Sequence, residues 1–382
     1  MYGTSITSVP SLSNSTARTG VPSEAIPEHF PLLRGAKRLL RIPPPPACEI
    51  RSGRTACHAE GVRYLGSSDG RPELLALRAL KLGDLLVAVP ALQGLRRAFP
   101  HHRLVVAVPG WLEPIVELVD GVDALLPTVG LDDPLPLPPG RVDVAVNLHG
   151  SGRESRLLVD ALAARVTMAH RVPGIDGDPP ADPRMPPWRD DVSERERWVR
   201  LVRAFGVAAD ADEVRLRSAP APPGAEGLTV VHVGAAYGSR LWPVKRFAEV
   251  ARHLAARGHG VVFTGDERER ERALAVAGAS GHSDAAVLAG RLSLGRFAGV
   301  IERARLVVSA DTGAAHLASA YATPSVVLFG PAPPERWGPP PGPHAVLTAA
   351  ELRRGDPFGE KPDPALLAVT VEDVLRAVDV LE

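Results

Sequence analysis

The residues best suited to chemistry in this 382-residue chain lie in one short stretch near its C-terminal end, from Asp311 to His316. Leu306 to Ala310 is an apolar run typical of a buried parallel strand, and residues 314–321 predict a short helix rich in alanine. We expect Asp311 to cap this helix and His316 to stay neutral beside its positive dipole end. Free backbone N–H groups at the start of a helix bind anions. The stretch therefore predicts a site for a phosphate-bearing ligand.

Asp84 occupies a comparable position in the N-terminal half. Leu74 to Leu80 predicts the first strand of a doubly wound sheet, and the turn at Gly83 and Asp84 leads into a helix over residues 85–99. A carboxylate at the carboxyl end of such a strand points into the ligand crevice, where it could take a proton from a hydroxyl nucleophile. The alternative is that Asp84 only caps the helix.

Two further candidates follow strands of the C-terminal half. Arg240 precedes Trp242, and its planar guanidinium could hold a diphosphate and stabilise the charge of a leaving group. Alternatively, Arg240 only packs on Trp242 at the surface. Glu267 follows a strand over residues 260–264, where an acidic residue commonly accepts ribose hydroxyls. The alternative is that Glu267 only favours the start of a charged helix.

The elements that would position these residues alternate between strand and helix. This alternation predicts mostly parallel, doubly wound sheets, and a Pro- and Gly-rich linker divides them into two halves. The predicted fold class is therefore α/β, with two facing Rossmann-like domains and a cleft between them. We assign an N-terminal acceptor-side domain to 73–218, the linker to 219–227, a C-terminal donor-binding domain to 228–345, and a tail with a final helix to 346–382.

Residues 1–72 differ in composition from the rest. They are rich in Ser, Thr and Pro, and they predict a disordered extension. Within this extension, residues 30–42 mix leucines with arginines and lysine, which could form a basic amphipathic helix on an anionic membrane surface. A flexible tail is the simpler interpretation.

Composition excludes several classes of protein. Equal numbers of basic and acidic residues, 44 of each, leave no net charge to favour nucleic acid. The apolar runs are too short for a transmembrane helix, and the N-terminus lacks the features of a signal peptide. Cys48 and Cys57 have no neighbouring His or Cys cluster, which argues against zinc and for a reducing compartment. We expect a cytoplasmic protein. If it contacts the inner membrane surface, we expect that contact to be peripheral.

The chain resembles the heptosyltransferases of bacterial glycosyltransferase family 9. Residues 77–92, which include Gly83 and Asp84, are similar to the opening of that family. The second half is similar at five places, namely residues 232–235, 240–243, 265–267, 309–316 and 328–331. The similarity covers roughly residues 73–345, in the order expected of one family.

This resemblance implies a GT-B fold and an inverting, metal-independent transfer of a sugar from a nucleotide diphosphate to a hydroxyl of a glycan or glycolipid acceptor. ADP-heptose is the favoured donor, and no cofactor is implied. The resemblance assigns roles to seven residues. Asp84 would be the general base. Arg240 would bind the diphosphate, and Glu267 would bind the ribose. The phosphates would be held by the segment that contains Asp311, Thr312, Gly313 and His316.

Two alternatives come from other classes. A non-catalytic nucleotide-sugar-binding protein would share the fold, but the presence of both Asp84 and Arg240 argues against it. A dinucleotide oxidoreductase would need a Gly-x-Gly-x-x-Gly turn after an early strand, which this sequence lacks. The loop over residues 235–239 departs from the family pattern.

Overall fold

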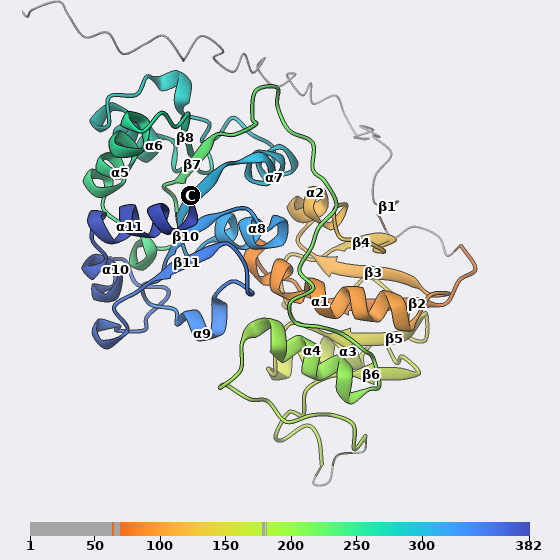
Figure 1. The fold of residues 1–382 in the computed structure, drawn as a ribbon. Coiled ribbons are helices and arrows are strands. Elements are labelled where there is room, and N and C mark those ends of the chain that lie inside the picture. The colour runs from red at the N-terminus through yellow and green to blue at the C-terminus, as the bar shows by residue number, and fades with distance from the viewer. Residues whose placement is uncertain (1–62, 65–68, 178–179, 181) are drawn as a thin grey trace, which may run out of the picture. The chain divides into compact units, whose positions relative to one another are not determined.

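The computed structural model describes residues 63–64, 69–177, 180 and 182–382. Most of the expected extension over residues 1–72, including the amphipathic segment 30–42 and both cysteines, lies outside the described residues. Two of its residues, Arg63–Tyr64, form β1 and pair in parallel with β4. The described residues contain two separate parallel β-sheets, each accompanied by helices (Figure 1).

The first sheet has six parallel strands in the order β1-β4-β3-β2-β5-β6. Because β3 and β4 lie on one side of β2, and β5 and β6 on the other, the strand order reverses between β2 and β5. Ligands of doubly wound sheets bind outside the carboxyl ends of the strands at such a point. The elements are β2 (Glu73–Leu77), α1 (Leu82–Ala98), β3 (Arg103–Val108), α2 (Glu113–Val116), β4 (Ala124–Pro127), β5 (Val142–Asn147), α3 (Arg153–Asp160), β6 (Val166–Met168) and α4 (Glu194–Ala204).

The second sheet has five parallel strands in the order β11-β10-β9-β7-β8, so its order reverses between β7 and β9. The elements are β7 (Thr229–His232), α5 (Val244–Ala256), β8 (Val261–Thr264), α6 (Arg270–Ala279), α7 (Leu294–Arg303), β9 (Leu306–Ala310), α8 (Gly313–Tyr321), β10 (Ser325–Leu328), α9 (Pro334–Trp337), β11 (His344–Leu347), α10 (Pro364–Ala368) and α11 (Val371–Leu381). Strands β7, β8, β9 and β10 are short and fully buried, as expected for parallel strands covered on both faces, whereas β11 at the edge is only partly buried.

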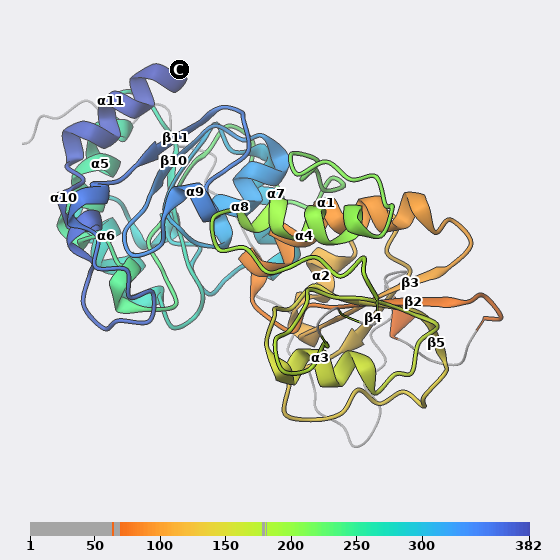
Figure 2. The ribbon, with the colours of Figure 1, turned by 90° about the horizontal axis from the view of Figure 1, so that it is seen from below.

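Helices α1 and α8 join the two halves. Both are rich in small and apolar residues, and the largest core cluster contains side chains of both, among them Leu85, Leu86 and Leu317. Figures 1 and 2 place α8 beside the start of α1 in two perpendicular views. Helices α2 and α7 also contact each other. The switch points of the two sheets are therefore brought together by packed helices.

Two elements differ from what the sequence pattern predicts. Residues 111–119 predict a helix but form only the end of a 3₁₀ turn and α2, which has Pro114 in its first turn. Residues 285–288 predict a brief strand but form a 3₁₀ turn and one bridge between Phe263 and Val287. The final helix expected in the tail is α11, which packs on α5 and β11 and adds its buried side chains to the second core.

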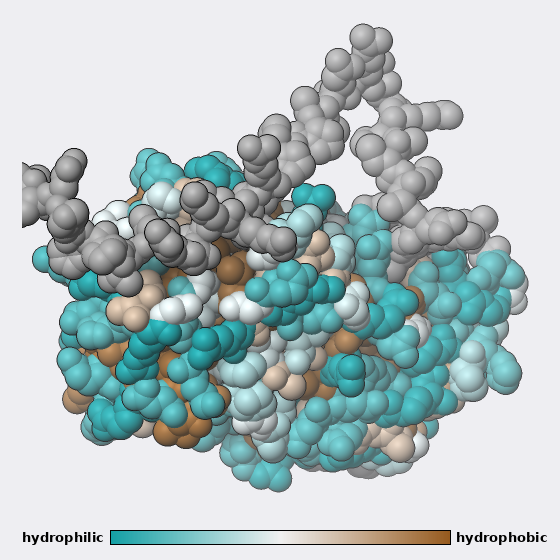
Figure 3. All heavy atoms as spheres, turned by 45° about the horizontal axis from the view of Figure 1, so that its top comes forward, coloured by the Kyte–Doolittle hydropathy of each residue, from teal (hydrophilic) through white to brown (hydrophobic). Residues whose placement is uncertain are grey.

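On the face that Figure 3 shows, hydrophilic side chains predominate and the hydrophobic ones occur in small, separate groups. Of the helices in the described part of the chain, none has the length and apolar character needed to cross a membrane.

Candidate active site

Asp84 lies in the first turn of α1, just beyond the end of β2. Its Oδ2 accepts a hydrogen bond of 3.2 Å from the backbone N–H of Lys81, so the carboxylate does stabilise the start of the helix. Its Oδ1 is 3.2 Å from Nη2 of Arg78. The side chain is still 23% exposed. Capping and access to a ligand are therefore compatible at this position.

Arg78, which was not among the residues singled out from the sequence, holds Asp84 in place. Its guanidinium is buried and stacks over the ring of Trp198, 4.5 Å from the ring centroid. It donates hydrogen bonds to the carbonyl oxygens of Asp84, at 2.9 Å, and Leu148, at 2.6 Å. Burial lowers the pKa of Arg78, and the nearby Asp84 carboxylate opposes this shift. The one signal in the sequence is an isolated arginine in the apolar run over residues 74–80, directly after the end of β2.

His149 lies beside this pair at the end of β5, where its carbonyl oxygen is 3.4 Å from Nη1 of Arg78. Burial lowers the pKa of His149 to about 4, and the positive charge of Arg78 acts in the same direction. The ring is therefore neutral at pH 7 and adds no charge near Asp84.

Asp311 anchors two basic side chains of the second half. It follows β9, is 4% exposed, and places Oδ2 at 3.2 Å from Nη1 of Arg240 and Oδ1 at 3.8 Å from Nε2 of His316. Burial raises the pKa of Asp311 and lowers that of His316. The expectation that Asp311 caps α8 is wrong, because its carboxylate is directed at Arg240. The cap is Thr312, whose Oγ1 accepts a hydrogen bond of 3.3 Å from the N–H of Ala314.

The starts of α1 and α8 touch each other. A Cβ added to Gly83 would lie 2.8 Å from Cδ2 of His316, and one added to Gly313 would lie 2.6 Å from Cδ2 of Leu82. Glycine at both positions permits this close approach. Burial lowers the pKa of His316, and the negative charges of Asp311 and, to a smaller extent, Asp84 oppose this shift. The structure thus brings Asp84, Arg240, Asp311 and His316 into one neighbourhood.

A cavity of about 500 Å³ opens at this junction. This volume is within the range of small-molecule sites. Its lining comes from both halves of the described chain, namely Lys81, Leu82, Gly83, Trp111, His232, Ala235, Ala236, Gly265, Asp266, Arg268, Glu269, Leu292, Leu294, Phe297, Thr312, Gly313 and Ala314. The start of α8 lines one part, and apolar side chains line another. Asp84, Arg240, Asp311 and His316 are not in the lining, but Asp84 directly follows Gly83 and Asp311 directly precedes Thr312.

His232 closes the apolar part of the cavity from the end of β7. Its Nδ1 is 3.0 Å from Oγ1 of Thr264, and its ring lies 5.6 Å from that of Phe297 with an angle of 34° between the planes. Burial lowers the pKa of His232 to about 4, so the ring is neutral at pH 7. Together with Leu292 and Leu294, the two rings present an apolar surface to the cavity.

Glu267 is placed outside the cavity, whereas Glu269 lines it. Glu267 is exposed, and its carboxyl group lies against Gly290, where no Cβ would fit. Glu269 Oε2 accepts a hydrogen bond of 2.7 Å from the N–H of Asp266, and its carboxyl group fills the space beside Gly234. Burial raises the pKa of Glu269. The acidic side chains available to a ligand are therefore those of Asp266 and Glu269.

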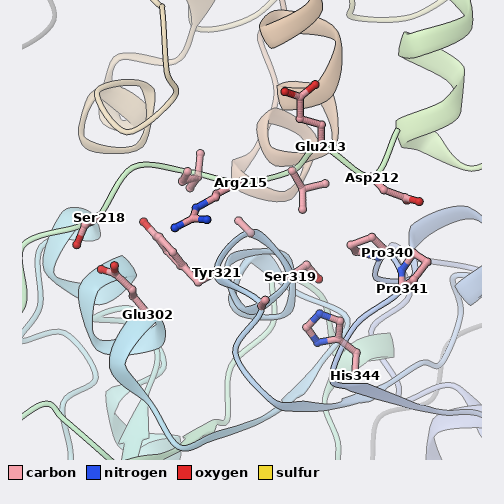
Figure 4. Close-up of a pocket in the computed structure, with 14 residues that line it drawn as sticks. Asp212, Glu213, Arg215, Ser218, Glu302, Ser319, Tyr321, Pro340, Pro341 and His344 are labelled. Carbon is pink, nitrogen blue, oxygen red and sulfur yellow. The ribbon is translucent and has the colours of Figure 1, made fainter. Parts of the chain in front are cut away.

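A second cavity, of about 540 Å³, lies at the other end of α8 (Figure 4). Three of its polar side chains already have partners in the protein. Tyr321 donates to the carbonyl of Arg217, Glu213 pairs with Arg97, and Glu302 accepts from the N–H of Ala219. None of the residues predicted from the sequence lines it. The cavity at the start of α8 is the better candidate site.

No group of three or more His, Cys, Asp or Glu side chains is placed to hold a metal ion in the parts of the chain that the structure describes. The positive charge near the cavity comes instead from Lys81, Arg240, Arg268 and the N-terminus of α8.

Comparison with known proteins finds similar sequences and a similar fold. Residues 204–357 match the family model described as glycosyltransferase family 9 (heptosyltransferase). Lipopolysaccharide heptosyltransferase 1 of Pseudomonas aeruginosa is 41% identical over 121 residues, a match that spans 31% of this chain and only 33% of that relative. Lipopolysaccharide heptosyltransferase 2 of Escherichia coli is 23% identical over 81% of this chain and 98% of its own length. The solved structure of E. coli ADP-heptose lps heptosyltransferase II has a TM-score of 0.64 and 19% identity, and the match covers 81% of this chain and 98% of that one. Residues 204–357 therefore resemble glycosyltransferase family 9, and the chain has the GT-B fold of the solved heptosyltransferase structure.

Proposed function

We propose that this protein transfers a sugar from a nucleoside-diphosphate donor to a hydroxyl group of a glycan or glycolipid, with inversion at the anomeric carbon. The observation that carries the proposal is the contact between the starts of α1 and α8 beside one cavity. It sets a partly exposed carboxylate from the first half, that of Asp84, close to the anion-binding helix end of the second half.

The donor would lie along the cavity in three parts. The nucleobase would stack on the surface formed by His232 and Phe297, since flat apolar surfaces suit its ring. The ribose hydroxyls would donate to Glu269 or Asp266, in place of the Glu267 favoured by the sequence. The diphosphate would meet the N–H groups at the start of α8, with Arg240 beside them. Here Asp311 would act as a positioning residue that orients Arg240.

The reaction would be a single displacement. Asp84 would take the proton of the acceptor hydroxyl while that oxygen forms a bond to the anomeric carbon. The bond from this carbon to the diphosphate oxygen would break, and the nucleoside diphosphate would leave with the electron pair. Arg240 and the start of α8 would stabilise the charge that develops there, so that no divalent ion is needed. In a single displacement of this kind the acceptor would attack from the face opposite the leaving group, which would invert the anomeric centre.

ADP-heptose is the donor we favour, because the relatives named above are heptosyltransferases and the solved E. coli structure among them is that of an ADP-heptose lps heptosyltransferase. For the same reason, the acceptor would be a sugar of the lipopolysaccharide core. Such an acceptor is attached to lipid, and we therefore place the enzyme at the cytoplasmic face of the inner membrane, held there peripherally.

The test is a panel of nucleotide sugars with the purified protein. We expect ADP-heptose to raise the melting temperature more than UDP-glucose or GDP-mannose do, and to be consumed with release of ADP when a lipopolysaccharide core acceptor is added. EDTA should leave the rate unchanged. Binding of the donor without any release of ADP would instead support a non-catalytic sugar-nucleotide-binding protein. Failure of every donor to bind would overturn the proposal.

A further inference from the structure

Lys81 lines the donor cavity from the first half of the chain and has no carboxylate partner among the described residues. Its backbone N–H donates to Asp84, but its ammonium group extends in another direction. There, Nζ lies 4.4 Å from the ring centroid of Tyr237 and 3.4 Å from the hydroxyl of that residue. Tyr237 belongs to the second half of the chain, three residues before Arg240.

The other cations at the site are already neutralised. Arg268 lines the cavity but pairs with Asp266 at 2.5 Å, and Arg240 pairs with Asp311 at 3.2 Å. The lining also carries two acidic side chains, those of Asp266 and Glu269. A diphosphate that enters this cavity brings at least two negative charges, so an additional cation is needed to balance them. In the described lining, Lys81 is the cation without an acidic partner.

The contact of Lys81 with Tyr237 can be exchanged for a stronger one. An exposed cation–π contact is weak compared with charge-assisted hydrogen bonds from an ammonium group to phosphate oxygens. The lysine side chain is long and flexible, with three donors that rotate freely. The residues next to Lys81 lie against the start of α8, since Leu82 contacts Gly313 and Gly83 contacts His316. The backbone of Lys81 therefore lies next to the start of α8, where the phosphate would bind.

We propose that Lys81 binds the diphosphate of the donor, and that Tyr237 holds the lysine side chain at the edge of the cavity until the donor enters. This inference rests on the proposed function, and it adds a donor-binding residue from the half of the chain that carries Asp84. Its consequence is that the donor is held by both halves at once. Binding of the diphosphate would then stabilise the arrangement in which Asp84 faces the anomeric carbon.

The segment behind Tyr237 supports this role. The ring of Tyr237 stands edge-on to Phe358 at 5.1 Å, and the N–H of Ser239 donates to the carbonyl of Gly359 at 2.8 Å. A Cβ on Gly238 would collide with the backbone of Glu360. Tyr237 is thus held by its own half of the chain, so it offers a fixed resting place to a mobile lysine.

The test compares ADP affinity, measured by calorimetry, for the wild type and for Lys81→Met, Lys81→Arg and Lys245→Met. Lys245 is an exposed lysine on α5 outside the cavity and serves as the control. We expect Lys81→Met to weaken ADP binding about tenfold, as for the loss of one charge-assisted contact, and to reduce the salt dependence of binding. Lys81→Arg should retain most of the affinity, and Lys245→Met should behave as the wild type. The melting temperature without ligand shows whether each variant is folded.

Tyr237→Leu separates binding of the diphosphate from a merely structural contact. If Lys81 binds phosphate, this variant should bind ADP as well as the wild type or more tightly, because the lysine is released. If Lys81 matters only through Tyr237, both substitutions should weaken binding alike, which would overturn the inference. Wild-type affinity in Lys81→Met would overturn it as well while leaving the proposed function intact. A wild type that does not bind ADP would instead contradict the proposed function itself.

Discussion

Gly83 and His316 touch across the two halves of the protein, so closely that a Cβ on Gly83 would lie 2.8 Å from Cδ2 of the imidazole. Asp84 is the next residue after Gly83, and Asp311, which lies 3.8 Å from His316, directly precedes Thr312, the N-cap of α8. The position of the proposed base relative to the proposed phosphate site is therefore set by a contact that only glycine permits. The neutral, buried ring of His316 acts as a spacer between the two helix ends.

Gly83→Ala should impair catalysis more than folding. The added methyl group must displace the His316 ring or separate α1 from α8, and overpacking of this kind costs about 1–3 kcal/mol. We expect a lower kcat with a folded protein, measured by steady-state kinetics and thermal unfolding. Gly278→Ala in α6 is the control, because nothing lies within 4 Å of a Cβ at that position. Normal kcat in Gly83→Ala would show that the contact is not needed for turnover.

Asp84→Asn should reduce kcat by about 10²–10⁴, the usual contribution of a general base, and leave ADP affinity nearly unchanged. Because Asp84 also stabilises the start of α1, a control with the same structural role is needed. Asp373 provides it, since it occupies the same place in the first turn of α11 and accepts a 3.0 Å hydrogen bond from the N–H of Thr370. Asp373→Asn should lose about 0.5 kcal/mol of stability without loss of activity. Equal activity losses in the two variants would reduce Asp84 to a helix cap.

Glu269→Gln should raise the KM for the donor about tenfold, because an amide replaces a carboxylate that accepts charge-assisted hydrogen bonds from ribose. Glu267→Gln should leave the KM near the wild-type value, since Glu267 lies outside the cavity. The two glutamates are two positions apart in the sequence, and each substitution replaces a carboxylate by an amide. Steady-state kinetics with varied donor would decide, and a larger effect at Glu267 would return the ribose role to the residue favoured by the sequence.

The general architecture could be predicted from the sequence because parallel strands covered on both faces are short apolar runs. Such runs can be recognised in the sequence when they alternate with helices. The family resemblance and the GT-B fold are confirmed by the comparisons. The role of Arg78 could not be predicted, since one arginine in an apolar run does not reveal which carbonyls and carboxylate it will meet. For Asp311, the choice between capping α8 and pairing with Arg240, 71 residues away, depends on tertiary contacts. The choice between Glu267 and Glu269 depends on a turn that directs the Asp266 N–H to Glu269.

His170 should make the protein less stable in mild acid. It is fully buried, its ring centroid lies 5.1 Å from that of Trp188 and 5.9 Å from that of Trp198, and burial lowers its pKa to about 4. In the unfolded chain a histidine has a pKa of about 6.5. Between these values the unfolded state binds more protons, so the free energy of unfolding falls as the pH falls from 6.5 towards 4. At pH 5 the loss from this one residue is about 2 kcal/mol relative to pH 7.5.

His170→Phe keeps an aromatic ring between the two tryptophans and removes the titrating group. We therefore expect urea unfolding at pH 7.5 to give a stability close to that of the wild type, and unfolding at pH 5 to give a higher one. Some pH dependence should remain, because His149 and His232 also have pKa values lowered to about 4 by burial. His101→Phe, at an exposed position, is the control and should follow the wild type. If His170→Phe loses as much stability between the two pH values as the wild type does, the buried ring must already carry its proton in the folded protein, and the proposed origin of the acid sensitivity is wrong.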